Sequence, residues 1–263
     1  MWFDAGVNLT NQRLLNDLEG VMARAKSNQV EQMLVIATNE EESRRALRLC
    51  ERYPGRLFAT VGIHPHDADQ ASANFVDVLA DLARHPAVVA IGECGLDFNR
   101  NFSSPDNQQT VFAEQISLAN RLDLPLYLHE RDAQQQQLNL LEKYCADHTP
   151  CLSHCFTGGP AQAEAYLERG HWFGITGWVT DERRNHQLLQ ALPGLPRERL
   201  LIETDAPFLL PRHIKPRPKF NEPALLPVIG DALAAQWALD LAEVAAITRT
   251  NTEQLFGCRQ SQP

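Results

Sequence analysis

Residues 87–97 read Ala87-Val88-Val89-Ala90-Ile91-Gly92-Glu93-Cys94-Gly95-Leu96-Asp97. The first five residues are apolar, which is typical of a strand buried on both faces, and the run then stops at Gly92 and Glu93. A carboxylate at the end of such a strand is costly to bury unless a cation or hydrogen bonds compensate its charge. Taken alone, Glu93 could equally be a residue that has emerged into solvent, so the rest of the chain decides its meaning.

The same kind of apolar segment recurs along the chain, and each one is followed by a stretch with helical spacing of apolar residues. The strands are predicted at residues 2–9, 33–37, 57–63, 88–91, 125–128, 151–153, 172–176 and 200–202. The helices are predicted at residues 14–25, 40–53, 75–84, 108–121, 134–144, 161–169, 181–192, 224–237 and 241–256. This alternation predicts an α/β fold, a single-domain (β/α)8 TIM barrel with C-terminal helices that covers residues 1–263.

Polar side chains follow four of these predicted strands. Glu93 follows the fourth, His129 the fifth, His154 the sixth and Asp205 the eighth. In a (β/α)8 barrel the carboxyl ends of the strands converge on one mouth, so residues far apart in sequence can share a ligand. A histidine at a strand end is by itself more often structural, but two imidazoles and two carboxylates together suit Zn²⁺, Mn²⁺ or Mg²⁺. The four residues therefore predict a divalent metal site.

The net charge of −9 argues against a general polyanion-binding surface. Any nucleic-acid activity would need metal ions or a local basic segment. Residues 211–219 form such a segment, with the cations Arg212, Lys215, Arg217 and Lys219. This loop is either a solvated surface loop stiffened by prolines or an electrostatic guide for a phosphate backbone. Trp178 and Phe208 could stack on bases there, although such aromatic residues equally often serve packing.

Nothing in the sequence predicts a membrane or secretion segment. No apolar run approaches the ~20 residues that a membrane helix needs, and the N-terminus lacks a basic region followed by a hydrophobic one. The six cysteines show no spacing typical of structural zinc, which favours reduced thiols. We therefore expect a cytoplasmic protein, and a monomer because no amphipathic appendage demands a partner.

Five segments together resemble the TatD family of metal-dependent deoxyribonucleases, which belongs to the amidohydrolase-like barrels. They are Gly62-Ile63-His64-Pro65-His66, Ile91-Gly92-Glu93-Cys94-Gly95-Leu96-Asp97, Leu128-His129 with Arg131, His154-Cys155-Phe156-Thr157-Gly158 and Glu203-Thr204-Asp205-Ala206-Pro207. The resemblance extends from the first predicted strand to Asn221-Glu222-Pro223, which is nearly the whole chain.

This resemblance implies a 3′→5′ exonuclease acting on single-stranded DNA, and possibly RNA, with a possible role in DNA repair or nucleic-acid turnover. It implies dependence on Mg²⁺, with Mn²⁺ or Zn²⁺ as alternatives. Carried over to this chain, Glu93, His129 and His154 would bind one metal, and Asp205 a second metal or the attacking water. The residues expected to face the substrate phosphate are His64, His66 and Arg131.

The first predicted strand departs from the family pattern. Most members end this strand with His-x-His, which supplies two ligands, whereas Gly6 and Asn8 occupy these positions here. Glycine has no side chain, and a neutral amide is a weaker ligand than imidazole. We therefore predict one firm metal held by Glu93, His129 and His154, and a second site that is weak, filled only with substrate present, or absent.

Phosphodiester hydrolysis explains why these residue types are needed. Attack on the phosphate builds negative charge that a metal can neutralise while it lowers the pKa of water. Asp205 is then the expected catalytic base. Two other functions stay open at this point: a metal-dependent hydrolase of a small lactone, amide or phosphoester, which the acidic charge favours, and a non-enzymatic scaffold with a residual metal site.

Overall fold

The computed structural model describes residues 1–212 and 214–258. Over these residues eight strands alternate with helices in chain order, as predicted. The chain forms two compact units, one made of residues 1–35 and 155–263 and the other of residues 36–154. A single domain covering residues 1–263 stays a prediction.

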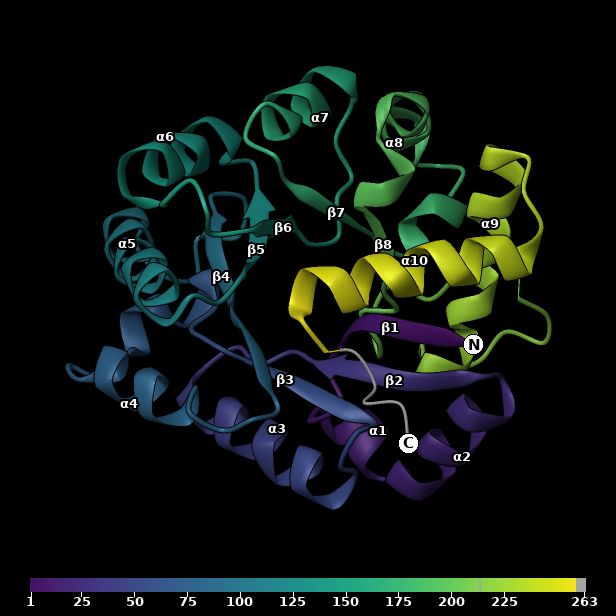
Figure 1. Cartoon of the computed structure of the whole chain (residues 1–263), viewed down its shortest axis with the longest axis horizontal. Coiled ribbons are helices and arrows are strands. Elements are labelled where there is room, and N and C mark those ends of the chain that lie inside the picture. The colour runs from purple at the N-terminus through teal and green to yellow at the C-terminus, as the bar shows by residue number, and fades with distance from the viewer. Residues whose placement is uncertain (213, 259–263) are drawn as a thin grey trace. The chain divides into compact units, whose positions relative to one another are not determined.

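The second unit, residues 36–154, contains four parallel strands in the order β3-β4-β5-β6. These strands are Leu57–Val61, Val88–Asp97, Leu126–Arg131 and Cys151–Ser153. The helices are α3 (Glu40–Arg52), the 3-10 turn η1 (Pro65–Gln70), α4 (Phe75–Leu82), α5 (Pro105–Leu122) and α6 (Gln134–Tyr144). Helix α5 lies along β4 (Figure 1), so that the residues of β4 are buried throughout.

The first unit contains two pairs of parallel strands, β1 with β2 and β7 with β8. They are Trp2–Val7, Val30–Val35, Trp172–Ile175 and Leu200–Ile202. The other elements are α1 (Gln12–Leu15), α2 (Leu18–Ser27), α7 (Pro160–Leu167), η2 (Gly177–Thr180), α8 (His186–Ala191), η3 (Leu192–Gly194), η4 (Arg197–Arg199), η5 (Pro223–Leu225), α9 (Leu226–Trp237) and α10 (Leu241–Phe256). Helix α10 lies against β1 and β8 (Figure 1).

Local sequence signals explain where several helices begin. The Asn39 side chain caps α3 by accepting a hydrogen bond from the Glu42 amide. Ser104 caps α5, and Pro105 occupies the first helical position, where its missing N–H is not needed. Asp240 and Glu243 form a reciprocal capping box at α10.

Two predicted strands end too early, and the difference matters for the site. Strand β4 continues past Ile91 to Asp97, and β5 continues past Leu128 to Arg131, because Gly95–Asp97 pair with His129–Arg131. Glu93 and His129 are therefore strand residues instead of loop residues that follow a strand. Helix α8 begins at His186 instead of residue 181, since η2 and a turn at Asp181 occupy the preceding segment.

No helix within the described ranges is long and apolar enough to cross a membrane by itself. The segments Pro223–Trp237 and Leu241–Phe256 reach the required length and composition only when taken together, and they are bent by 106°.

Candidate metal centre

Glu93 is held inside the second unit by its own backbone. Its N–H donates to the Ala37 carbonyl at 2.9 Å, and the residue is buried, with only 5% of its surface exposed. The register of β4 against β5 shifts between Gly92 and Cys94. Gly92 has φ +147° and lies so close to the Tyr127 backbone that a side chain there would collide with it. Only glycine fits this position next to Glu93.

Three imidazoles surround one oxygen of Glu93. Its Oε1 lies 3.0 Å from Nδ1 of His129, 3.4 Å from Nε2 of His64 and 3.5 Å from Nε2 of His154. Burial opposes the ionisation of Glu93, but electrostatic interactions with His64 and His154 and hydrogen bonds with His129 and His64 outweigh it. Together they hold the pKa of Glu93 well below its usual range. Glu93 is therefore a carboxylate that nitrogen donors already surround.

His129 lies between two carboxylates. Its Nδ1 faces Glu93, and its Nε2 lies 3.3 Å from Oδ2 of Asp97. Burial disfavours the charged imidazole, yet the hydrogen bonds to Asp97 and Glu93 raise the pKa of His129 to about 9. Without a metal, the protonated ring supplies the positive charge that both carboxylates require. A metal ion on the Nδ1 side can take over that role once the Nδ1 proton has left.

His64 differs from His129 in the proton it carries. Its Nδ1 accepts a hydrogen bond from the His66 backbone N–H at 3.0 Å. Burial lowers the pKa of His64 to about 4, so the ring is neutral at pH 7 and its proton is on Nε2. Nε2 can then donate to an acceptor but offers no lone pair to a metal. This geometry favours His64 as a hydrogen-bond donor over His64 as a ligand.

His154 is oriented from behind by an aromatic side chain. The Tyr127 hydroxyl lies 2.9 Å from Nδ1 of His154, and both residues are buried. With Nδ1 protonated and donating to this hydroxyl, Nε2 keeps a lone pair on the Glu93 side. The partner of the remote nitrogen thus determines which nitrogen can bind a metal.

The donor set of Glu93, His129 and His154 suits a divalent cation. One ligand atom from each residue lies within 4.8 Å of the others, and a carboxylate oxygen with two imidazole nitrogens can bind Zn²⁺, Mn²⁺ or hydrated Mg²⁺. A second group, His64, His66 and His129, meets the same distance criterion. It fits a metal less well because His64 has one nitrogen engaged and the other protonated.

Asp97 is the residue of this centre that sequence reasoning missed. It is buried, and its Oδ2 lies 2.7 Å from Nε2 of His66 and 3.3 Å from Nε2 of His129. Its Oδ1 accepts the backbone N–H groups of Asn99 and Arg100. Burial opposes the charge, but the hydrogen bonds from His129, from the Arg100 N–H and from His66 hold the pKa of Asp97 well below its usual range. Its even spacing from Glu93 is the sequence signal that could have found it, since alternate strand residues share a face.

Asp205 belongs to the first unit, where β1 holds it. Its N–H donates to the Gly6 carbonyl at 2.8 Å, and the Asn8 side chain donates to its Oδ1 at 2.8 Å. Asp205 has φ +52°, a left-handed conformation that these contacts stabilise. The two positions that lack the family histidines thus carry backbone and amide groups that orient Asp205. Its assignment as metal ligand or base stays a prediction.

The remaining predicted residues lie as follows. His66 is half-buried on η1, and its ring centroid is 4.3 Å from that of His64. Arg131 is the exposed last residue of β5. The cations of the 211–219 loop are exposed, and His213 of that loop, for which the sequence predicts no role, lies outside the described residues. The six cysteines, all within the described residues, form no disulfide.

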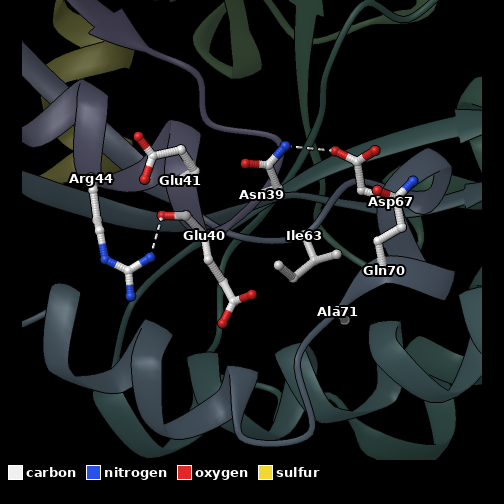
Figure 2. Close-up of a pocket in the computed structure, with 8 residues that line it drawn as sticks. All are labelled: Asn39, Glu40, Glu41, Arg44, Ile63, Asp67, Gln70 and Ala71. Carbon is white, nitrogen blue, oxygen red and sulfur yellow. Dashed lines mark hydrogen bonds between the residues drawn. The ribbon is translucent and has the colours of Figure 1, made fainter.

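The segment with His64 and His66 also borders a solvent-open hollow of about 350 Å³ (Figure 2). Asn39 donates to Asp67 across it at 2.8 Å, which ties η1 to the start of α3. Its charged lining consists of Glu40, Glu41, Asp67 and Arg44. Three carboxylates and one guanidinium make this hollow unfavourable for a phosphate. It contains none of the predicted site residues.

The chain is similar to several known proteins. The chain is 47% identical over 256 residues to the 3′-5′ ssDNA/RNA exonuclease TatD of Salmonella typhimurium strain LT2, covering 97% of this chain and 98% of that protein. It superposes on a TatD-family hydrolase from Entamoeba histolytica with a TM-score of 0.89 at 23% identity, covering 98% of both chains. It also matches the TatD homologue YJJV from Escherichia coli K12 with a TM-score of 0.86 at 29% identity, covering 97% of this chain and 98% of that one.

The two structural likenesses confirm the predicted fold class, an amidohydrolase-like (β/α)8 TIM barrel with helices at the C-terminus. The model of the TatD related DNase family matches residues 3–257, which is nearly the whole sequence. The resemblance drawn from the five segments is therefore confirmed, and this chain belongs to the family of TatD related DNases.

Proposed function

We propose that this protein is a Mg²⁺-dependent exonuclease that removes nucleotides from the 3′ end of single-stranded DNA or RNA. The observation that carries the proposal is the Glu93 carboxylate, whose Oε1 lies within 3.5 Å of three imidazole nitrogens. The name of the Salmonella relative at 47% identity supports the same activity. A place in DNA repair or nucleic-acid turnover in the cytoplasm follows as part of the proposal.

In this reaction Glu93, His129 and His154 hold the metal. A divalent ion bound there supplies charge neutralisation at the phosphate and a lower pKa for the attacking water. His64 donates its Nε2 proton in a hydrogen bond to a phosphate oxygen, because its Nδ1 is already engaged with the His66 N–H. Asp97 keeps the His129 ring oriented through Nε2.

Asp205 is the proposed base. Asn8 and Gly6 fix its backbone and one carboxylate oxygen, so the carboxylate is oriented before substrate arrives. Such a group takes a proton from the attacking water when it lies within hydrogen-bond reach. Arg131 and His66 are proposed to contact the phosphate backbone. Because the Asn8 side chain already orients the Asp205 carboxylate, a second, firmly held metal is not needed for that purpose.

The decisive experiment follows the ends of a labelled strand. A single-stranded oligonucleotide carrying a 5′ label is incubated with protein and Mg²⁺, and a second one carries a 3′ label. We expect a ladder of shortening 5′-labelled products and immediate release of the 3′-labelled nucleotide, with neither in EDTA. A Glu93→Gln protein purified in parallel controls for contaminating nucleases. Release from the 5′ end, or no hydrolysis with Mg²⁺, Mn²⁺ or Zn²⁺, overturns the proposal.

The small-molecule alternative is tested in the same preparation. Lactone, amide and simple phosphoester substrates are offered with the same ions. The hollow beside η1 and the −9 charge favour neutral or cationic small molecules more than nucleic acid. Turnover of such a substrate combined with inert oligonucleotides would make the protein a small-molecule hydrolase.

A further inference from the structure

Two arginines are anchored on a buried carboxylate just after η2. Asp181 is 3% exposed, and it accepts paired hydrogen bonds of 2.8–3.0 Å from Arg183 and from Arg184. The hydrogen bonds from Arg183, followed by those from Arg184, hold the pKa of Asp181 well below its usual range. The two arginine side chains are 61% and 49% exposed. Since each guanidinium has five donors, each still presents donors to solvent.

The basic loop after β8 joins this pair. The Arg212 N–H donates to Thr180 Oγ1 at 3.0 Å, and its Nε lies 3.8 Å from Asp181. The Leu209 carbonyl lies directly on Gly177, where a side chain would collide with it. The loop is thus seated on η2, and its cations extend the surface that Arg183 and Arg184 begin.

The charge of this surface is opposite to that of the chain. The segments 177–185 and 206–220 contain two carboxylates, Asp181 and Glu182, in a chain whose net charge is −9. Against them stand six cations, Arg183, Arg184, Arg212, Lys215, Arg217 and Lys219, all of them exposed. A local surplus of this kind attracts polyanions even when the protein as a whole repels them.

Aromatic side chains lie among these cations. The Arg184 guanidinium is 4.0 Å from the centre of the Trp178 ring, which braces the arginine. Phe208 is 47% exposed, so part of its ring is accessible to a base. A surface that holds both cations and aromatic rings suits a single strand, whose phosphates need charge and whose bases need a stacking surface.

The position of the surface relates it to Asp205 within the same unit. Strands β7 and β8 are parallel, with Ile175 opposite Ile202, so η2 and the segment from Glu203 onward leave the sheet at the same edge. Asp205 lies in that segment. We propose that the six cations with Trp178 and Phe208 form a basic platform that binds the part of a single-stranded nucleic acid lying 5′ to the cleaved bond. This proposal rests on the exonuclease function above.

Binding without hydrolysis tests the platform directly. Fluorescence anisotropy of a labelled single strand of about ten nucleotides is measured in EDTA at several salt concentrations. One variant carries Arg183→Gln and Arg184→Gln, and another carries Lys215→Gln, Arg217→Gln and Lys219→Gln. We expect the Kd to rise about tenfold or more in each, and the salt dependence of log K to become shallower by about 0.7 for each phosphate that the variant no longer neutralises.

The controls separate the platform from general charge. Arg44, Arg48 and Arg84 are exposed arginines of the second unit, and their replacement by glutamine removes as much charge as the loop variant. We expect this control to bind as the wild type does. Loss of Arg183 and Arg184 could prevent folding by leaving the buried Asp181 carboxylate without partners, which thermal unfolding would reveal. In that case the variant of Lys215, Arg217 and Lys219 alone tests the platform, because it leaves Asp181 paired with its arginines.

Two results overturn the platform. One is a loop variant whose Kd and salt dependence equal those of the wild type, and the other is a control variant whose binding is weakened as much as that of the loop variant. Hydrolysis is scored separately as the ratio of kcat/KM for the long strand to that for a dinucleotide, which we expect to fall in the platform variants. A wild type that binds the strand through these residues but hydrolyses nothing would overturn the exonuclease proposal and leave the platform standing.

Discussion

Glu93 and Asp4 are both buried carboxylates, one in each unit, and their surroundings give them opposite properties. Glu93 is 5% exposed among imidazoles, and its pKa lies well below the usual range. Asp4 is 0% exposed and accepts hydrogen bonds from neutral groups, the N–H and hydroxyl of Thr204 and the Gly6 N–H. Burial raises the pKa of Asp4 to about 7, and the neighbouring Glu203 contributes.

Of these two buried acids, only Glu93 has surroundings that can hold a cation. Burial raises the pKa of both carboxylates, so the difference between their pKa values comes from the groups that hydrogen-bond or face them. An imidazole can carry a proton, or lose that proton to solvent and bind a metal in its place, so a positive charge stands beside Glu93 in either state. Thr204 and Gly6 donate hydrogen bonds without carrying charge, so Asp4 is a structural link between β1 and the end of β8. Four substitutions test this difference, and they are given in order of decreasing effect on hydrolysis.

Glu93→Gln should remove metal binding and hydrolysis together. The amide keeps the volume but loses the charge that three imidazoles surround, and the lost electrostatic stabilisation of several kcal/mol corresponds to a loss of hydrolysis on the order of a thousandfold. Titration calorimetry with Mn²⁺ and the labelled-strand assay measure the two losses. Retention of tight metal binding would show that another group of residues holds the ion.

Asp205→Asn should separate the two properties. The new amide oxygen can still accept the hydrogen bond from Asn8, so the segment keeps its conformation. We expect metal affinity at the Glu93 centre to stay within a few fold, while hydrolysis falls by about a hundredfold or more, the range for loss of a general base. Near-normal hydrolysis would remove Asp205 from the mechanism.

The fold was predictable because its signal is repeated locally. Each apolar run and each helical pattern predicts its own element, and errors in one do not affect the others. The failures were at element ends, as with β4. Its last six residues include two glycines and two carboxylates, which single-residue preferences do not assign to a strand. Pairing with β5 overrides those preferences.

The site was predictable in residue type but not in roles. Glu93, His129 and His154 were named from the sequence, and the structure brings them within 4.8 Å of one another. Sequence cannot show that Nδ1 of His64 accepts a hydrogen bond from its own loop, or that Asp97 and Tyr127 each lie within hydrogen-bond distance of one ring nitrogen of His129 and His154. Nor could it show that Asp181, a buried acid, anchors two exposed arginines. These facts depend on side-chain geometry across elements.

Asp97→Asn tests whether support from behind His129 matters. The amide cannot supply the same charge to the His129 and His66 rings, so the His129 tautomer with a free Nδ1 becomes less favoured. We expect metal affinity to fall about 10- to 100-fold, as for other groups that orient a metal-bound histidine. Calorimetry measures the affinity, and thermal unfolding in EDTA controls for loss of structure. Unchanged affinity would make Asp97 a purely structural residue.

Asp4→Asn should have the smallest effect on the reaction and should act on stability alone. The pKa of Asp4 rises from its ordinary value of 3.8 to about 7 on folding. Between these pH values the folded chain keeps a proton that the unfolded chain has released. The contribution of Asp4 to stability is therefore complete below about pH 4 and is lost as the pH rises through about 7. The uncharged amide cannot show this loss.

Acids with lowered pKa, such as Glu93 and Asp97, act in the opposite direction, so the measurement is the difference in Tm between wild type and variant from pH 4 to 8. We expect the variant to gain relative to the wild type over this range, and parallel Tm curves would mean that Asp4 is ionised in the folded protein just as Glu93 is.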